Sequence, residues 1–371
     1  MIKNWQYLDE YHHERLQILE IVDRVFSSGR LILGPEVAAF ESAFAEYCGV
    51  AHGVGVNSGT DALFLALKAL GIGQGDEVIT VANTAVPTVA AIRASGARPV
   101  FVDVEEDTFL IDVSQIERAI TRRTKCILPV HLFGQTADMG PLLELAARYE
   151  LKVLEDCAQA AGALYQGNKA GSFGDIAAFS FYPTKVLGGY GDGGMVITSS
   201  DAHHEKLRSL RFYGMKEAYY SEDEGYNSRL DEVQAALLRH KLGTLDESVR
   251  KRQDIAQHYT KELAGVEGIV VPIVRSGRTH QFYTYTIRTK HRDALMRYFL
   301  EHKIEGRINY PTPIHLMRGY AFLNVEKGRL PRTEQLAGEI LSLPLYPGLA
   351  QEDVEQVIQC IKRYFAQAHT A

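Results

Sequence analysis

Short apolar runs alternate with helix-periodic segments along the first half of the chain. The apolar runs predict seven buried strands, at 52–56, 77–81, 98–104, 125–133, 151–158, 176–181 and 194–199. Helix-periodic segments such as 60–70 and 139–150 lie between the first five of them. This alternation is typical of an α/β fold with a mainly parallel sheet covered on both faces. Ligands of such sheets bind beyond the carboxyl ends of the strands.

The remainder of the chain has a different pattern. Further helices are predicted at 14–27, 36–47, 230–264, 292–302 and 351–368, and one more strand at 281–288. Gly243 is a candidate bend within the longest helical segment. We therefore expect a large domain at 1–242 and a smaller α+β domain at 243–371. A chain of 371 residues is long enough for two domains.

Charge and composition narrow the class of protein. A net charge of −6 gives no reason to expect nucleic acid or an anionic membrane as a partner. No apolar run is long enough to cross a bilayer, and the N-terminal segment lacks the apolar core of a signal peptide. The four cysteines lie far apart, which is typical of reduced thiols in a cytoplasmic protein. No metal site is expected, because the histidine pairs at 12–13 and 203–204 would point apart on a helix.

The first of three chemical features is the segment VNSGTDALFLAL at 56–67. A strand, a small polar turn and a helix would present free N–H groups at a helix N-terminus, which suits a phosphate. Gly59 would let the backbone approach a ligand closely, and Ser58 and Thr60 would supply hydroxyls. Taken alone, Ser58 or Thr60 is more simply explained as a helix cap.

The second feature is a pair of carboxylates, Glu155 and Asp156, at the carboxyl end of a predicted parallel strand. A carboxylate in that place needs a cationic partner, and a protonated pyridine nitrogen would be one. Gln159 can lie on the same side of the turn that follows. The structural alternative is an aspartate that caps a loop or a helix.

The third feature is the segment SFYPTKVLGGYGDGG at 180–194. It contains the pattern GxGxxG, but a strand is predicted after it instead of a helix, which argues against a Rossmann dinucleotide site. Its glycines would let the loop pass close to a ligand. A partly desolvated Lys185 could attack an aldehyde, although a solvated surface lysine is the structural alternative. The three features together match the phosphate, the ring nitrogen and the aldehyde of pyridoxal phosphate.

At this point the sequence resembles the DegT/DnrJ/EryC1/StrS family of sugar aminotransferases. The matching motifs include VNSGTDAL (56–63), EDCAQAAGA (155–163), FSFYPTKVLGGYGDGG (179–194), GYNSRLDEVQAALL (225–238) and NYPTPIH (309–315). The resemblance extends from about residue 30 to the C-terminal helix. It implies a type I pyridoxal-phosphate fold, usually a homodimer whose active site is shared between the subunits.

Carried over by position, the resemblance implies roles for individual residues. The phosphate of the cofactor would be held by Gly59, Thr60 and Ser180, together with Asn227 of the partner subunit. Asp156 would pair with the pyridine nitrogen, and Gln159 would lie near the ring oxygen. Lys185 would form the Schiff base and move the proton. Some relatives have histidine at this position and are dehydratases, so Lys185 favours transamination.

The resemblance also implies the substrates. L-glutamate would be the amino donor, and Gln159, Tyr182 and the NYPTPIH segment favour a dTDP-linked 3-keto-6-deoxyhexose, giving a 3-amino-3,6-dideoxyhexose. The candidate substrate contacts are Tyr182, Tyr190, Arg229, Tyr310 and His315, and the candidates for the diphosphate are Arg211, Arg229 and Arg307. Amination at C4, a keto-inositol substrate, and a non-catalytic regulatory protein that keeps the fold and the cofactor are alternatives.

One position departs from the family pattern. Many relatives carry an aromatic residue that stacks on the cofactor ring in the segment corresponding to 83–92, where this chain has Ala85. Val86 or Pro87 would then cover the ring, or an aromatic side chain would come from elsewhere.

Overall fold

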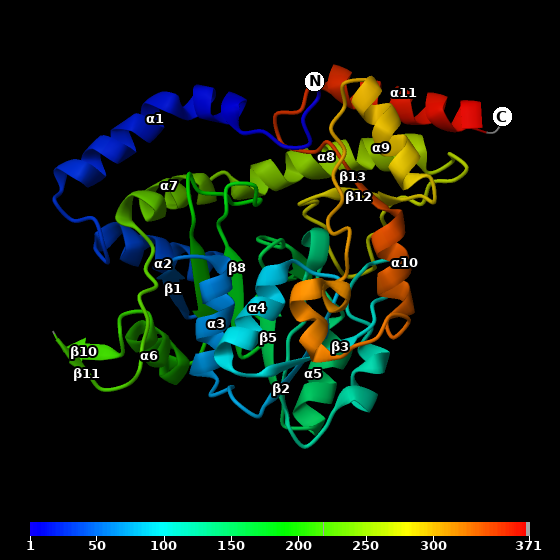
Figure 1. The fold of residues 1–371 in the computed structure, drawn as a ribbon. Coiled ribbons are helices and arrows are strands. Elements are labelled where there is room, and N and C mark those ends of the chain that lie inside the picture. Colours follow the sequence, from blue (N-terminus) through cyan, green and yellow to red (C-terminus); the bar gives the residue numbers. More distant parts are fainter. Residues whose placement is uncertain (218, 369–371) are drawn as a thin grey trace.

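The computed structural model, which describes residues 1–217 and 219–368, is built around one seven-stranded sheet (Figure 1). Its strands are β1 (His52–Val56), β2 (Glu77–Val81), β3 (Arg98–Val102), β4 (Thr124–Ile127), β5 (Lys152–Asp156), β8 (Ile176–Ser180) and β9 (Gly194–Thr198). Their order in the sheet is β1-β9-β8-β5-β4-β2-β3. All neighbours from β8 to β3 pair in parallel, whereas β9 is antiparallel to both β1 and β8. The predicted α/β fold with a mainly parallel sheet is therefore confirmed.

Helices cover both faces of this sheet (Figure 1). They are α2 (Pro35–Cys48), α3 (Gly59–Ala69), α4 (Val86–Ser95), α5 (Met139–Arg148), α6 (Asp201–Leu210) and α7 (Glu232–Leu242), with α1 (Leu8–Ser27) outside them. Strand β9 illustrates why the strands are apolar throughout. Val196 joins the core that contains α3, whereas Met195 and Ile197 join the core on the other face, which contains α2 and α7. Because both faces of the sheet are buried, the strand does not alternate between apolar and polar residues. It is a continuous apolar run instead.

The predicted strand at 125–133 is shorter in the structure. Strand β4 ends at Ile127, because Pro129 has no N–H to donate and the chain then turns into the 3₁₀ helix η3 (Leu132–Gly134). The other short elements are β6 (Leu164–Tyr165), β7 (Asn168–Lys169), β10 (Met215–Glu217), β11 (Tyr220–Ser221), η1 (Val113–Gln115), η2 (Glu117–Ala119), η4 (Ile314–Leu316) and η5 (Arg318–Leu323). Among the described residues, no helix has both the length and the apolar character that crossing a membrane requires.

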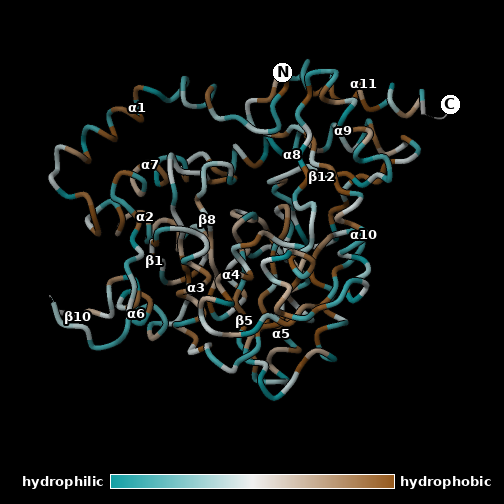
Figure 2. Tube along the Cα trace, in the orientation of Figure 1, coloured by the Kyte–Doolittle hydropathy of each residue, from teal (hydrophilic) through white to brown (hydrophobic). Residues whose placement is uncertain are grey.

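A second core lies in the C-terminal part of the chain. It contains α8 (Leu245–Leu263), β12 (Tyr285–Arg288), α9 (Arg292–Glu301), β13 (Ile340–Leu343) and α11 (Gln351–Ala368), and α10 (Pro331–Glu339) precedes β13. The break between α7 and α8 falls at Gly243 and Thr244, where the sequence predicts a bend. Figure 2 shows hydrophobic segments gathered in the middle of the molecule, around β5 and α3.

The N-terminal residues belong to this second core. Ile2 packs within it, Trp5 packs against it, and Ile2 pairs with Ile304 in a short parallel bridge. The prediction groups these residues with the large domain, whereas the structure puts them beside α11 and α9, at the end of the molecule where both termini lie (Figure 1). The domain boundary at 242/243 itself stays a prediction.

Candidate active site

A cavity of about 300 Å³ opens at the carboxyl ends of the sheet strands. Its walls come from the segments that follow β1, β2, β4, β5 and β8, and from Tyr283 and Tyr310 in the C-terminal part. The predicted site residues that line it are Ser58, Gly59, Thr60, Asp156, Gln159, Ser180, Tyr182, Lys185 and Tyr310. Residues from distant stretches of the sequence therefore meet in one place.

The first wall is the N-terminus of α3. Ser58 caps this helix, because its hydroxyl accepts a hydrogen bond from the N–H of Asp61 at 3.1 Å. Gly59 and Thr60 follow as the first helical residues, so their N–H groups have no partner within the helix. A Cβ on Gly59 would lie 2.6 Å from the Cβ of Ser180, so glycine lets α3 approach β8 closely. The resulting corner, with the helix dipole behind it, suits an anion.

The second wall carries Asp156 at the end of β5, where only 4 % of the residue is exposed. Its carboxylate accepts hydrogen bonds from the N–H of Ala158 at 3.1 Å and from the hydroxyl of Thr88 at 2.9 Å. Burial raises the pKa of Asp156, while these two bonds and the charge of Lys185 act in the opposite direction. A cation in the cavity would relieve the cost of this buried charge.

Thr88 was not identified from the sequence, although it lies in the first turn of α4 directly after β2. Its hydroxyl is 2.8 Å from that of Thr84, and both threonines are buried. Thr84 and Thr88 therefore form a short chain of hydroxyls that ends on Asp156. The position of Thr88 after a parallel strand is the signal that could have revealed it.

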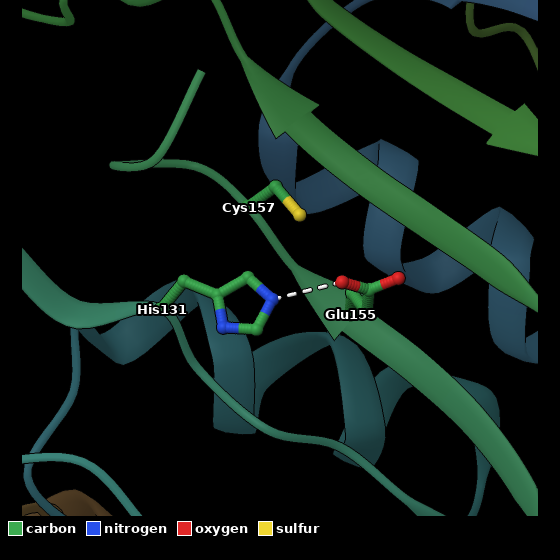
Figure 3. Close-up of side chains that lie close together, drawn as sticks. All are labelled: His131, Glu155 and Cys157. Atoms are coloured by element: carbon green, nitrogen blue, oxygen red, sulfur yellow. Dashed lines mark hydrogen bonds and ion pairs between the residues drawn. The ribbon is translucent and has the colours of Figure 1, made fainter. Parts of the chain in front are cut away.

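The other face of β5 carries Glu155, which is fully buried beside His131 and Cys157 (Figure 3). The carboxylate lies 2.9 Å from Nε2 of His131, whose Nδ1 accepts the N–H of Ala137 at 3.1 Å, so Nε2 carries the proton. Glu155 also accepts three backbone N–H groups, those of Gly171, Phe173 and Gly174. Burial raises the pKa of Glu155, but these hydrogen bonds outweigh it and keep the pKa below its ordinary value.

These bonds decide what the His131, Glu155 and Cys157 cluster does. The three residue types can ligate a metal, but both ring nitrogens of His131 and both oxygens of Glu155 already have partners. Burial also raises the pKa of the Cys157 thiol well above its ordinary value, which keeps it protonated. The cluster therefore supports the end of β5 and thereby the neighbouring Asp156.

The third wall carries Lys185 in the loop between β8 and β9. The two strands pair in antiparallel fashion, so the GxGxxG pattern joins two strands and is not a Rossmann motif. The Nζ atom of Lys185 lies over the ring of Tyr283, 4.6 Å from its centroid. The lysine amine, the carboxylate of Asp156 and the N-terminus of α3 thus face one cavity.

The family follows from the whole sequence. The sequence pattern of the DegT/DnrJ/EryC1/StrS aminotransferase family matches residues 13–362. The chain belongs to this family. The predicted family, the predicted class of enzyme and the predicted cofactor, pyridoxal phosphate, are confirmed with it.

Three comparisons illustrate the likeness. The chain is 52% identical over 363 residues to the dTDP-3-amino-3,4,6-trideoxy-alpha-D-glucose transaminase of Micromonospora megalomicea subsp. nigra, covering 96% of this chain and 97% of that one. It is 44% identical over 359 residues to the pleiotropic regulatory protein of Geobacillus stearothermophilus, covering 96% of each. The crystal structure of S. venezuelae DesV in complex with a ketimine intermediate superimposes with a TM-score of 0.96, at 43% identity and 98% coverage of both chains.

The groups in the cavity of this aminotransferase fit its cofactor. A phosphate fits the N-terminus of α3, a protonated ring nitrogen fits the buried carboxylate of Asp156, and an aldehyde fits the amine of Lys185. Without such a cation, Asp156 would keep a buried charge that its surroundings disfavour.

Gln159 and Tyr310 form a hydrogen-bonded pair in the cavity wall. The side-chain oxygen of Gln159 accepts the N–H of Phe133 at 2.7 Å, and its amide donates to the hydroxyl oxygen of Tyr310 at 3.0 Å. Burial raises the pKa of Tyr310, so its hydroxyl keeps a hydrogen. That hydrogen remains for donation to a ligand, because Tyr310 accepts from Gln159.

The aminotransferase departs from its family at Ala85, and the structure shows what lines the cavity there. Ala85 and Pro87 both contribute to the wall, whereas Val86 is exposed. The aromatic residues in the described wall are Tyr182, Tyr283 and Tyr310. The cavity wall thus contains both kinds of residue that the sequence suggests as a cover for the cofactor ring, Pro87 and aromatic side chains from other segments. That one of them covers the ring stays a prediction.

The loop glycines serve a different purpose from the one expected. A Cβ on Gly189 or on Gly191 would lie 2.9 Å from the side-chain amide of Gln234 in α7, and a Cβ on Gly188 would lie 2.4 Å from the carbonyl oxygen of Pro183. These three glycines allow close packing within the protein, and Gly193 lines the cavity. The expectation of a ligand beside the whole loop is therefore too broad.

Tyr190 does not line the described cavity, unlike the prediction. Its ring makes edge-to-face contacts with Tyr7 and Tyr11, at centroid distances of 5.9 and 6.2 Å, and Nζ of Lys241 lies over it at 4.6 Å. Tyr190 thus packs beneath α1. Packing is the structural alternative to a substrate contact for an aromatic residue in an irregular loop.

Five further predicted contacts also lie outside the cavity walls. His315 is buried, with Nε2 3.1 Å from Glu334. The arginines have other neighbours: Arg211 pairs with Glu41, Arg307 pairs with Glu305, and Arg229 lies over Phe212 and Tyr213. Asn227 is exposed. Arg211 and Arg307 are thus engaged in ion pairs within the chain.

Proposed function

We propose that this protein transfers the amino group of L-glutamate to a dTDP-linked 3-keto-6-deoxyhexose, which gives a dTDP-linked 3-amino-3,6-dideoxyhexose and 2-oxoglutarate. The observation that carries the proposal is the meeting of Lys185 and Asp156 in one cavity with the N-terminus of α3. The cavity of about 300 Å³ is also within the size range of small-molecule sites. The choice of C3 rests on Gln159 and Tyr182, and on the name of the Micromonospora relative.

Each residue of the cavity has a task in this reaction. Pyridoxal phosphate, when bound, supplies an aldehyde that takes up an amino group and a ring that accepts electrons. Asp156 would keep the ring nitrogen protonated, and the N-terminus of α3 with Ser180 would hold the phosphate. Lys185 would hold the cofactor through its aldehyde between turnovers, and its free amine would move a proton at the reacting carbon. Gln159 and Tyr310 offer hydrogen bonds to the ring oxygen or the sugar.

The two substrates would use the cavity in turn, which gives the proposal a simple test. Protein loaded with pyridoxal phosphate is mixed with L-glutamate alone, and the absorbance of the cofactor is followed. We expect conversion to the amine form without any sugar, followed by recovery of the starting spectrum when the accepted ketosugar is added. Mass spectrometry on dTDP- and UDP-linked 3-keto and 4-keto sugars then identifies the acceptor. A product only from a 4-keto sugar or a keto-inositol would refute amination at C3.

A second candidate function is a regulatory protein that binds the cofactor without turnover. The likeness to the pleiotropic regulatory protein of Geobacillus stearothermophilus supports it. The glutamate experiment separates the two functions, because a purely regulatory protein would not convert the cofactor to the amine form. Lys185 at the cavity favours the enzyme, since binding alone does not require an amine that can be released and reused.

We propose a homodimer as the working form. Apolar side chains lie exposed on and after α1, including Leu16 at 75 %, Phe26 at 58 % and Leu31 at 52 %. Asn227 is exposed and lies outside the cavity of its own chain, which suits a residue that reaches the site of a second copy. Light scattering during size-exclusion chromatography tests this, and Phe26→Glu is expected to shift the protein toward the monomer.

We place the protein in the cytoplasm as part of the same proposal. Its four cysteines are free and buried, as expected in a reducing compartment. Cell fractionation with an antibody against the protein would test the location.

A further inference from the structure

Tyr283 belongs to the C-terminal part of the chain and yet touches the lysine of the cavity. Nζ of Lys185 lies 4.6 Å from the centroid of the Tyr283 ring. The hydroxyl of Tyr283 is 3.1 Å from the hydroxyl of Thr184, the residue before Lys185. One aromatic side chain therefore contacts both the amine of the lysine and the side chain of the residue before it.

The ring is held by groups from both parts of the molecule. The N–H of Tyr283 donates to the carbonyl oxygen of Phe133 at 2.9 Å, on the sheet side of the cavity. The preceding carbonyl, that of Phe282, accepts from the buried guanidinium of Arg252 at 3.3 Å, and Arg252 also binds the carbonyl of Leu345 at 3.3 Å. These hydrogen bonds fix the peptide group between Phe282 and Tyr283, and with it the position of the Tyr283 ring.

The charged groups near Lys185 show why its contact with Tyr283 matters. Within the described part of the chain, Lys185 forms no ion pair, and the face of Tyr283 is its cation contact. The carboxylates in the wall are Asp156, which we assign to the ring nitrogen, and Asp192, which is exposed. An aromatic face attracts an ammonium group without forming a tight ion pair, so the amine can still be released for chemistry.

We propose that Tyr283 is a positioning residue for the proton transfer by Lys185. The inference rests on the proposed function. In that reaction the amine of Lys185 would take a proton from Cα of the amino donor, and the bound cofactor would supply the acceptor for the electron pair of the broken C–H bond. The ammonium of Lys185 would then give that proton to the carbon that bore the aldehyde oxygen. Between these events the ring of Tyr283 holds the ammonium in place and stabilises its charge.

The test compares aromatic and non-aromatic variants in the half-reaction with glutamate. Tyr283→Phe keeps the ring face and removes the bond to Thr184, whereas Tyr283→Leu and Tyr283→Met remove the face. We expect the two non-aromatic variants to react roughly 2- to 30-fold more slowly, in line with the strength of cation–π contacts. Tyr283→Phe and Thr184→Val are expected to stay within about threefold of the parent protein, since an uncharged hydrogen bond contributes little.

A second readout separates positioning from a general effect on structure. Glutamate deuterated at Cα should react with a larger isotope effect in Tyr283→Leu than in the parent protein, because proton transfer becomes more fully rate-limiting. Borohydride trapping and mass spectrometry should find the cofactor on Lys185 in every variant, and melting temperatures of the cofactor-free proteins should agree within a few degrees. Tyr283→Met keeps the test decisive if Tyr283→Leu does not fold.

The outcomes distinguish this inference from the proposed function. Parent protein that binds the cofactor on Lys185 but never reacts with an amino donor would refute the proposed function and the role of Tyr283 with it. Parent protein that reacts, together with non-aromatic variants of unchanged rate, would refute the role of Tyr283 alone. Slower variants with an unchanged isotope effect and less cofactor on Lys185 would also overturn it, since Tyr283 would then only support the fold.

Discussion

The substitution Asp156→Asn separates the fold of this protein from its chemistry. Asparagine has the shape of aspartate, and the surroundings can accept it. Its side-chain oxygen can accept the N–H of Ala158, and its amide can donate to the hydroxyl of Thr88. Thr88 can then turn its own hydrogen toward Thr84, since either hydroxyl of that pair can be the donor.

The expected effects on the two forms of the protein have opposite signs. Without cofactor, the variant no longer buries a charge, so its free energy of unfolding should equal that of the parent protein or exceed it by up to about 3 kcal/mol. With cofactor, the ring nitrogen loses its buried partner, which costs about 3–5 kcal/mol. Turnover should therefore fall by roughly two to almost four orders of magnitude.

The pH dependence follows from the direction of the pKa shift. Burial raises the pKa of Asp156 in the folded protein, so the protonated form favours folding and stability is lost as the pH rises through the folded pKa. The asparagine variant does not titrate. Its advantage without cofactor should be largest near neutral pH and should vanish in acid.

Thermal unfolding with and without pyridoxal phosphate, at several pH values, measures these differences. Turnover of glutamate with the accepted ketosugar is measured beside it. Asp192→Asn is a useful comparison, because this carboxylate lines the same cavity but is exposed to water. A cofactor-free Asp156→Asn protein that melts far below the parent would refute the assignment, because the charge would then support the fold. Turnover within threefold of the parent would refute it equally.

Three other substitutions test neighbouring assignments. Lys185→Ala should abolish the borohydride-reducible link to the cofactor and the turnover, and a link at another lysine would contradict the assignment. Thr88→Val removes a hydrogen bond to a charged group, so the pKa of Asp156 should rise further and kcat should fall about 10- to 100-fold; an unchanged kcat would count against Thr88. Glu155→Gln should lower the free energy of unfolding by about 2–5 kcal/mol in urea titrations. Because the pKa of Glu155 is lowered, that difference should disappear as the pH falls through its folded pKa, and a pH-independent difference would contradict the account.

The sheet could be predicted because its strands are buried on both faces. Val196 and its neighbours Met195 and Ile197 must all be apolar, since they enter two different cores, so each strand is visible as an uninterrupted run. The meeting of several candidate site residues in one cavity could be predicted for a related reason. Carboxyl ends of parallel strands meet at one edge, which brings Asp156 to the same cavity as the turn before α3.

Other residues could not be found in this way, because their positions depend on how distant parts of the chain pack. Tyr283 reaches the cavity from the segment before β12, and no local pattern announces which aromatic of that segment points at Lys185. Tyr190 is the opposite case, because the local sequence suggests a site residue and the cavity wall does not contain it. It lies among loop glycines that suggest a ligand, but α1 packs over it from the other end of the sequence. His315 likewise pairs with a glutamate of α10.

The distribution of charge in the cavity bears on the proposed homodimer. Among the described residues that line the cavity, Lys185 is the one basic side chain, while Asp156 and Asp192 are acidic. The proposed ligands are anionic: a phosphate, a sugar diphosphate and the two carboxylates of glutamate. Arg211 and Arg307, which could have met them, are held by Glu41 and Glu305. In the proposed homodimer, further cations for these ligands would come from the second copy. Arg229 beside the exposed Asn227 suits this task, since within the described structure it contacts aromatic rings and no carboxylate.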